Sequence, residues 1–263
     1  MKLDLTGKMA LVTGSNRNTG EIIAQSLAAS GAGVVFHGNE CDGSAALAAE
    51  AVRGGYSVEG DIATEAGCDA LVEQLKDLDL SVDILVNNYG TATAGKWGST
   101  TTEDWLQIYQ KNVLSVARLV QALVPAMKEK RWGRIVNLGT IGSHRPGKVM
   151  PHYYASKGAL ANLGVSLMQE LSNTGITVNT VSPGLIHTPD LEAGYRARAA
   201  KKGWGDKWED ILSHILKEEF PNACGRLATR EEVADLVVFL CCEQAAFING
   251  QNIRIDGGAI VYV

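Results

Sequence analysis

Short apolar runs alternate along the chain with longer segments in which apolar residues recur three and four positions apart. The short runs predict seven β-strands, at residues 9–12, 33–36, 57–59, 82–86, 134–138, 176–181 and 252–255. The longer segments predict helices at residues 22–31, 44–52, 65–78 and 102–127, and from positions 153 and 229 onward. Strands that alternate with helices indicate a parallel sheet with right-handed crossovers.

A glycine-bearing turn, Thr-Gly-Ser-Asn-Arg-Asn-Thr-Gly at residues 13–20, stands between the first strand and the first helix. Strand, glycine turn and helix in this order place backbone N–H groups at a pyrophosphate. With strand 33–36 the turn completes a βαβ unit. We therefore expect an α/β fold, a single doubly wound (Rossmann-type) domain over residues 1–263 with about seven parallel strands and helices on both faces.

Residues 189–222 break this rhythm and carry Tyr195, Trp204 and Trp208. We expect an apolar lid here, mobile without ligands and ordered over cofactor and substrate, as active-site lids are. Residues 93–97 and 143–152 are expected to line the substrate pocket together with it.

Composition and charge narrow the class of protein. The chain of 263 residues is 46% hydrophobic and 20% charged, as in ordinary globular proteins. A net charge of −5 argues against nucleic acid and anionic membranes as partners, and no apolar run approaches the ~20 residues of a membrane span. Five cysteines without Cys-x-x-Cys spacing favour reduced thiols in the cytoplasm. The five histidines show no ligand spacing with carboxylates, so no metal site is expected.

The segment Tyr153-Tyr154-Ala155-Ser156-Lys157 begins a helical pattern. Residues four apart share one helix face, so Tyr153 and Lys157 would present a phenol and an ammonium to the same point. A nearby cation lowers the pKa of a phenol, which is normally about 10, and such a pair exchanges a proton with a carbonyl or alcohol oxygen. Taken alone, the pair is more often a packed tyrosine beside a solvated lysine.

Asn112 falls on the apolar face of the predicted helix at residues 102–127. A buried amide needs hydrogen-bond partners or costs about 1–3 kcal/mol. Asn112 is therefore either a satisfied core amide or a group that holds a water or a side chain in a proton path.

The order and spacing of these motifs resemble the short-chain dehydrogenase/reductase family over essentially the whole chain. Residues 13–20 resemble its Thr-Gly-x-x-x-Gly-x-Gly loop, residues 87–90 its Asn-Asn-Ala-Gly turn, and residues 183–188 the segment that holds the nicotinamide amide. Asn112, Thr140, Tyr153 and Lys157 fall where the family keeps its Asn-Ser-Tyr-Lys catalytic set.

The resemblance implies oxidoreduction of a ketone or aldehyde to an alcohol, or the reverse, by hydride transfer with NAD(P)(H). Tyr153 would be the acid/base, Thr140 would donate to the substrate oxygen, Lys157 would lower the tyrosine pKa and hold the ribose, and Asn112 would bind a water. The residues expected to bind the cofactor are Gly14, Asn16, Arg17, Asn18, Thr19, Gly20, His37, Gly38, Asp61, Ile62, Asn88, Gly90, Tyr153, Lys157, Pro183, Gly184, Ile186 and Thr188.

Three positions depart from the family pattern: Asn18 replaces the middle glycine of the loop, Tyr89 replaces a small alanine, and Thr140 replaces serine. Asparagine tolerates a left-handed backbone better than most residues, so we expect the turn to survive. None of the three changes removes a reactive group.

The end of the second strand bears on the choice of cofactor. An NAD site places an acid there to accept from the ribose 2′-hydroxyl, whereas this chain has Gly38. Arg17 lies where a basic residue grips a 2′-phosphate in relatives that prefer NADP(H). We therefore expect preference for NADP(H), with NAD(H) possible through Glu40.

Two other functions stay open from the sequence, a 3-oxoacyl thioester (acyl carrier protein) reductase and a catalytically silent, cofactor-binding regulatory protein. The intact hydroxyl, tyrosine and lysine set argues against silence. The family resemblance also implies a homo-oligomer, a tetramer or a dimer.

Overall fold

The computed structural model describes residues 3–261 and contains a seven-stranded sheet in the order β3-β2-β1-β4-β5-β6-β7. Every neighbouring pair of strands in it is parallel. The strands are β1 (Met9–Val12), β2 (Gly33–Gly38), β3 (Tyr56–Glu59), β4 (Ile84–Asn87), β5 (Gly133–Leu138), β6 (Ile176–Pro183) and β7 (Asn252–Ile255). This confirms the predicted α/β, doubly wound parallel sheet.

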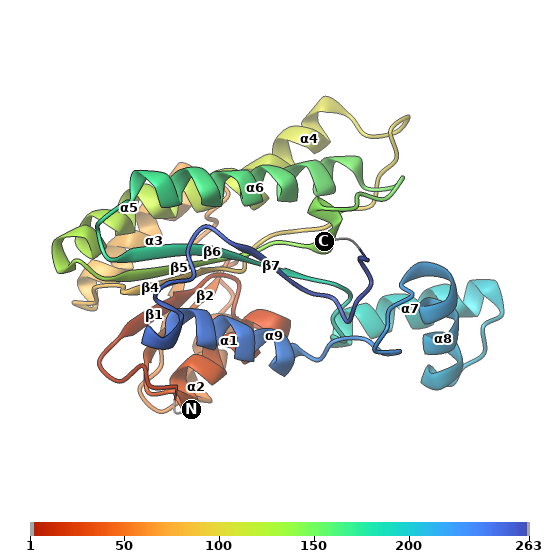
Figure 1. The fold of residues 1–263 in the computed structure, drawn as a ribbon, viewed down its shortest axis with the longest axis horizontal. Helices are drawn as coiled ribbons and strands as arrows, with labels where there is room; N and C mark the ends of the chain where they lie inside the picture. Colours follow the sequence, from red (N-terminus) through yellow and green to blue (C-terminus); the bar gives the residue numbers. More distant parts are fainter. Residues whose placement is uncertain (1–2, 262–263) are drawn as a thin grey trace.

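Helices cover both faces of the sheet (Figure 1). One layer contains α1 (Asn18–Ala29), α2 (Ser44–Glu50) and α9 (Arg230–Cys241). The other contains α3 (Glu65–Asp77), α4 (Thr102–Tyr109), α5 (Ser115–Lys130) and α6 (Pro151–Glu170). Successive side chains of a strand point to opposite faces of the sheet. Ala10 and Val12 therefore pack against α1 and α9, whereas Leu11 packs against α3 and α5. Strands that are buried on both faces consist of continuous apolar runs, so they could be predicted from the sequence.

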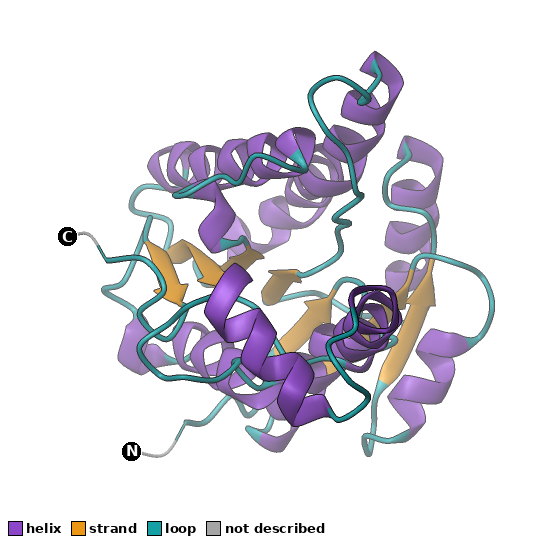
Figure 2. Cartoon of the chain, turned by 90° about the vertical axis from the view of Figure 1, so that its right-hand side faces the viewer, coloured by secondary structure: helices purple, strands orange, loops and turns teal. Residues whose placement is uncertain are grey.

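The strand order reverses between β1 and β4, because the chain builds β1, β2 and β3 outward on one side and continues from β4 on the other. In open parallel sheets, ligands bind at such a switch point, beyond the carboxyl ends of the strands. Figure 2 looks onto this end of the molecule.

The predicted helix at residues 102–127 is divided. A π-helical turn, Gln110–Leu114, separates α4 from α5 and contains Asn112. The prediction of one continuous regular helix over residues 102–127 is therefore wrong, because the π turn interrupts it. A π turn widens the helix by one residue and occurs frequently at functional sites.

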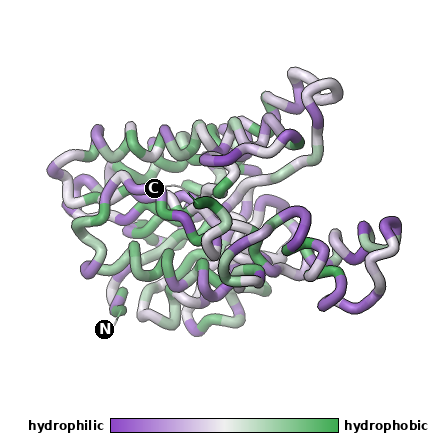
Figure 3. The backbone as a smooth tube through the Cα atoms, turned by 45° about the vertical axis from the view of Figure 1, so that its right-hand side comes forward, coloured by the Kyte–Doolittle hydropathy of each residue, from purple (hydrophilic) through white to green (hydrophobic). Residues whose placement is uncertain are grey.

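Residues 189–222 form a protruding unit, here called the lid, which contains α7 (Pro189–Lys202), α8 (Trp208–His214) and a π turn, Ile215–Glu219. It has a small core of its own, which includes Ala199, Ile211 and Phe220. Hydrophilic positions gather toward the outer end of the lid (Figure 3).

Both lid tryptophans pack against histidines. Trp204 is buried and stacks on His214 with ring centroids 5.0 Å apart, and Trp208 stacks on His187 at 5.1 Å. Trp204 packs within the lid, and Trp208 ties the lid to His187 in the connection from β6. That the lid closes as an apolar cover over the substrate stays a prediction.

Candidate active site

The turn between β1 and α1 depends on residues that accept unusual backbone geometry. Gly14 has φ +61° and Asn18 has φ +53°, so both lie in the left-handed region. A Cβ at Gly20 would lie 2.3 Å from the Gly14 carbonyl oxygen and 2.4 Å from Asn88 Nδ2, which leaves no room for a side chain. Asn88 Nδ2 donates to the Gly14 carbonyl at 2.9 Å and so ties the turn to the end of β4. Asn18 adopts the left-handed conformation that its substitution for glycine requires.

His37, near the end of β2, holds this turn from behind. The Gly14 N–H donates to Nδ1 at 3.0 Å, so Nδ1 carries no proton, and Nε2–H donates to the Gly60 carbonyl at 2.9 Å. Burial of the ring lowers the pKa of His37 to about 4, against the opposing hydrogen bond to Gly60. His37 is therefore a neutral structural support for Gly14.

Tyr153 lies in the first turn of α6, close to Thr140 at the end of β5. Thr140 is extended, with φ −160°, and its hydroxyl accepts from the Gly142 N–H at 3.2 Å. Burial raises the pKa of Tyr153, and a hydrogen bond with the Thr140 side chain partly offsets this increase. Burial is the larger effect, so the pKa of Tyr153 lies above its usual value in this structure, and a lowering by Lys157 stays a prediction.

Lys157 is buried one turn further along α6. Its ammonium donates at 2.7 Å to the carbonyl of Leu138, which is the last residue of β5. Burial lowers the pKa of Lys157 to about 8. A Cβ on Gly90 would lie 3.4 Å from Lys157 Nζ and 2.8 Å from Asn112 Oδ1, so the two side chains converge on the backbone at Gly90.

Both polar atoms of the Asn112 amide are hydrogen-bonded to protein partners. Its Nδ2 donates to the Thr91 carbonyl at 3.0 Å and to Ser156 Oγ at 2.9 Å, and its Oδ1 accepts from the Thr91 N–H at 2.8 Å. These bonds join the segment after β4 to α6, and the π turn carries the amide that makes them. Of the two interpretations of Asn112, the geometry directly supports the satisfied buried amide, while the bound water stays a prediction.

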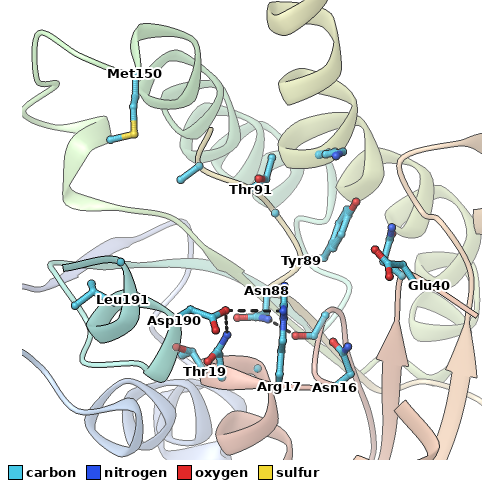
Figure 4. Close-up of a pocket in the computed structure, with 18 of the residues that line it drawn as sticks. Asn16, Arg17, Thr19, Glu40, Asn88, Tyr89, Thr91, Met150, Asp190 and Leu191 are labelled. Carbon is cyan, nitrogen blue, oxygen red and sulfur yellow. Dashed lines mark hydrogen bonds and ion pairs between the residues drawn. The ribbon is translucent and has the colours of Figure 1, made fainter. Parts of the chain in front are cut away.

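A cavity of about 1070 Å³ opens beside Gly90 and Thr91 (Figure 4). Its wall runs from the glycine turn, past the ends of β2 and β4, to the first turns of α7. The side chains of Asn112, Thr140, Tyr153 and Lys157 lie behind this wall and are not among the lining residues. The lining residues predicted to bind the cofactor are Gly14, Asn16, Arg17, Asn18, Thr19, Gly20, Asn88 and Gly90.

The other predicted cofactor residues lie elsewhere around this end of the sheet. His37 and Gly38 are buried behind the turn, Ile62 is in the core, and Asp61 is exposed beyond β3, where its Oδ1 accepts from the Ala63 N–H at 3.1 Å.

Residues 183–188 connect β6 to the lid. Pro183 ends β6, Gly184 lies against Phe220, Ile186 bridges to Ala228, and the Thr188 hydroxyl accepts from the Leu191 N–H at 3.1 Å. Contact of each of these residues with a cofactor stays a prediction.

Several lining residues were not assigned from the sequence. Asp42 follows β2 closely, and its spacing after the second strand is a signal that could have found it. Lys111 precedes Asn112 in the π turn, and Asp190 and Arg198 reach the cavity from α7. Asp190 lies 172 residues from its partner Asn18, and no local pattern links the two positions.

The residues around this cavity fit a dinucleotide. The side chain of Arg17, the residue before α1, makes no capping hydrogen bond, so the first-turn N–H groups of that helix stay available to an anion. Glycines at positions 14, 20 and 90 line the cavity and let the turn and the end of β4 pack closely together. The cavity volume of about 1070 Å³ is slightly above the roughly 300–1,000 Å³ typical of ligand sites, as expected for a cofactor with its substrate.

Metal and membrane features are absent from the described residues. Within residues 3–261, no group of three or more His, Cys, Asp or Glu side chains is placed to hold a metal ion. Nor does any helix in that range have the length and apolar character needed to cross a membrane.

Comparison with known proteins agrees with this site. Residues 14–259 match a family model described as enoyl-(acyl carrier protein) reductase. The chain is 33% identical to YvaG, an uncharacterized oxidoreductase of Bacillus subtilis, over 99% of this chain and 98% of that protein. It is also 33% identical to the 3-oxoacyl-[acyl-carrier-protein] reductase FabG of Escherichia coli, over 97% and 98% of the two chains.

Among solved structures, the L-sorbose reductase of Gluconobacter frateurii complexed with NADPH and L-sorbose superposes with a TM-score of 0.92. It is 32% identical, and the match covers 100% of both chains.

The fold and site thus define a dinucleotide-dependent oxidoreductase. More specifically, the chain belongs to the short-chain dehydrogenase/reductase family and is an NAD(P)-dependent enzyme that interconverts a carbonyl and an alcohol.

Proposed function

We propose that Tyr153 is the acid/base of this enzyme and acts together with Thr140, Lys157 and Asn112. The observation that supports the proposal is that these side chains form two pairs near the carboxyl ends of β4 and β5. Tyr153 bonds to Thr140, and Lys157 and Asn112 flank Gly90 at the wall of the cavity.

Each side chain has a distinct part in the proposed chemistry. When bound, the nicotinamide supplies or accepts the hydride. In the reductive direction Tyr153 gives its phenolic proton to the substrate oxygen, and the Thr140 hydroxyl donates to that oxygen as negative charge develops on it. Lys157, held by the Leu138 carbonyl, supplies positive charge near the phenolate and a donor for the ribose. Asn112 keeps residues 90–91 against α6.

NADP(H) is the proposed cofactor of choice. Arg17 lines the cavity with its side chain 73% exposed, and the amides of Asn16 and Asn39 line the same end. Two similar solved structures hold NADPH or NADP. Glu40 and Asp42 also line this end, so use of NAD(H) is compatible with the site.

The cofactor assignment is tested with Arg17→Ala. The variant should lose affinity for NADPH at least tenfold more than for NADH, because only NADPH carries the 2′-phosphate. A higher kcat/KM with NADH than with NADPH in the wild type would contradict the assignment and direct attention to Glu40.

For the substrate, the lid end of the cavity favours a small, polar carbonyl compound. Tyr195 and Arg198 line it and both bond to Glu219, with Tyr195 Oη donating at 3.0 Å and Arg198 Nη1 at 2.9 Å. Such a wall suits hydroxyl groups, and one similar structure holds L-sorbose. A 3-oxoacyl thioester is the second candidate, supported by 33% identity to FabG.

The substrate proposal is tested by a panel of ketoses, sugar acids, simple ketones and 3-oxoacyl thioesters with each cofactor. Turnover of a hydroxylated ketone with NADPH supports the proposal. A preference for the 3-oxoacyl thioester would instead identify the protein as a 3-oxoacyl thioester reductase. Absence of turnover with every compound would favour the catalytically silent, cofactor-binding protein.

A cytoplasmic homo-oligomer, a tetramer or a dimer, is part of the proposal. All five cysteines are free thiols, as in reducing compartments. An apolar groove between α5 and α6, lined by Val120, Leu163 and Leu167, offers a contact surface. Light scattering of the purified protein tests this point, and a monomer at micromolar concentration would contradict it.

A further inference from the structure

Asp190 connects the lid to the turn between β1 and α1. This turn contains Arg17, which is proposed to bind the 2′-phosphate of NADP(H). Asp190 lies in the first turn of α7 and lines the cavity. Its Oδ2 accepts from Asn18 Nδ2 at 2.7 Å and lies 3.9 Å from Arg17 Nη1 (Figure 4). Two segments 172 residues apart in sequence are thereby joined across one end of the cavity.

The Asp190 carboxylate lies next to the start of α1. Asn18 is the first residue of α1, and the N-terminus of a helix favours an anion because its N–H groups and dipole point toward it. Arg17, the N-cap residue of this helix, makes no side-chain capping bond. The Asp190 carboxylate comes from a different element and contacts the side chains of Asn18 and Arg17, two groups that a phosphate could also contact.

We propose that Asp190 is a competitor of the cofactor phosphates and so sets both cofactor affinity and the attachment of the lid. This inference rests on the proposed function in one respect, namely that a phosphate group of the cofactor binds next to Arg17. An incoming phosphate repels the carboxylate and offers Asn18 and Arg17 a more highly charged partner. Asp190 must then leave the turn, and because it belongs to the first turn of α7, the start of the lid moves with it.

The size of the effect follows from exposure. Asp190 is 62% exposed and Arg17 73%, so their attraction is screened and small, and a cofactor can displace it. Two unit charges about 4 Å apart in water interact by about 1 kcal/mol, which is a change of about fivefold in a dissociation constant. By reciprocity, cofactor binding loosens the Asp190 contact by the same factor.

Asp190→Asn is the critical variant, because asparagine keeps the size of the side chain and an oxygen that accepts from Asn18 but removes the charge. Asp206→Asn is the control, since it removes the same charge from an exposed position of the lid that does not line the cavity. The dissociation constants of NADPH and NADH are measured by nicotinamide fluorescence without substrate, at low salt and at 0.5 M NaCl.

The expected result is that Asp190→Asn binds NADPH about fivefold more tightly than wild type at low salt, with a smaller gain at high salt. Asp206→Asn should bind as wild type does. Unchanged or weaker binding by Asp190→Asn, or an equal gain in both variants, overturns the inference.

Hydrogen exchange of residues 189–202 supplies a second readout. In contrast to the expectation that the cofactor orders the lid, NADPH should increase exchange at the start of α7 in wild type. Asp190→Ala, which lacks the contact altogether, should show this faster exchange without cofactor. Identical exchange in the two proteins without cofactor overturns the inference. Neither measurement uses turnover, so failure of the Tyr153 chemistry leaves this test intact, whereas absence of NADPH and NADH binding in wild type refutes both.

Discussion

Acid should destabilise this protein through one buried side chain, His37. Its pKa is about 4 in the folded protein and about 6.5 in the unfolded chain. Between these values the unfolded chain binds a proton that the folded protein does not, so the free energy of unfolding falls as the pH falls from about 6.5 to 4. Each pKa unit corresponds to about 1.36 kcal/mol, which gives a loss of about 3 kcal/mol.

His37→Asn isolates this contribution. Asparagine places an acceptor near Nδ1 for the Gly14 N–H but does not titrate, so the variant should be less stable than wild type at pH 7 and less sensitive to acid. Urea unfolding at fixed protein concentration is followed at pH 7, 6, 5 and 4. Wild type should lose about 3 kcal/mol more than the variant over this interval.

His214→Asn provides the matched control, because it replaces a half-exposed histidine of the lid that is not part of the glycine turn. It should keep the loss of stability that His37 causes. Other groups titrate equally in all three proteins and cancel in the comparison. Equal losses in wild type and His37→Asn would refute the reasoning that a buried, neutral His37 supports the turn.

Three other substitutions test the site. Thr140→Ser should keep substantial activity, whereas Thr140→Val should lower kcat about 10²-fold or more, since one donor to the substrate oxygen is lost; equal rates would make Thr140 structural. Gly90→Ala should lower kcat at least tenfold and also lower the unfolding midpoint, because its Cβ would lie 2.8 Å from the buried Asn112 Oδ1 and force it to shift. Gly98→Ala is its control, since nothing lies within 4 Å of that position; equal activity of the two would show that the convergence at Gly90 is unimportant.

The sheet could be predicted from the sequence because its strands are buried on both faces and therefore apolar throughout. The π turn at Asn112 could not, because its amide is held by Thr91 and Ser156, which lie 21 and 44 residues away. Helical periodicity over residues 102–127 gives no sign of that interruption.

At the site, the pairing of Tyr153 with Lys157 follows from local helical spacing and was accessible to prediction. The direction of the Tyr153 pKa shift was not, because it depends on burial, which spacing does not reveal. The contact of Asp190 with Asn18 was also inaccessible, since it depends on where the lid returns to the sheet.

The central claim is that Tyr153 transfers the proton, and Tyr153→Phe tests it most directly. The ring and its packing are retained, so the variant should unfold at the same urea concentration and bind NADPH with the wild-type dissociation constant. Single-turnover oxidation of bound NADPH by the best carbonyl substrate should then be at least 10³-fold slower than in wild type, since the transferable proton is lost. A rate within tenfold of wild type would contradict the account.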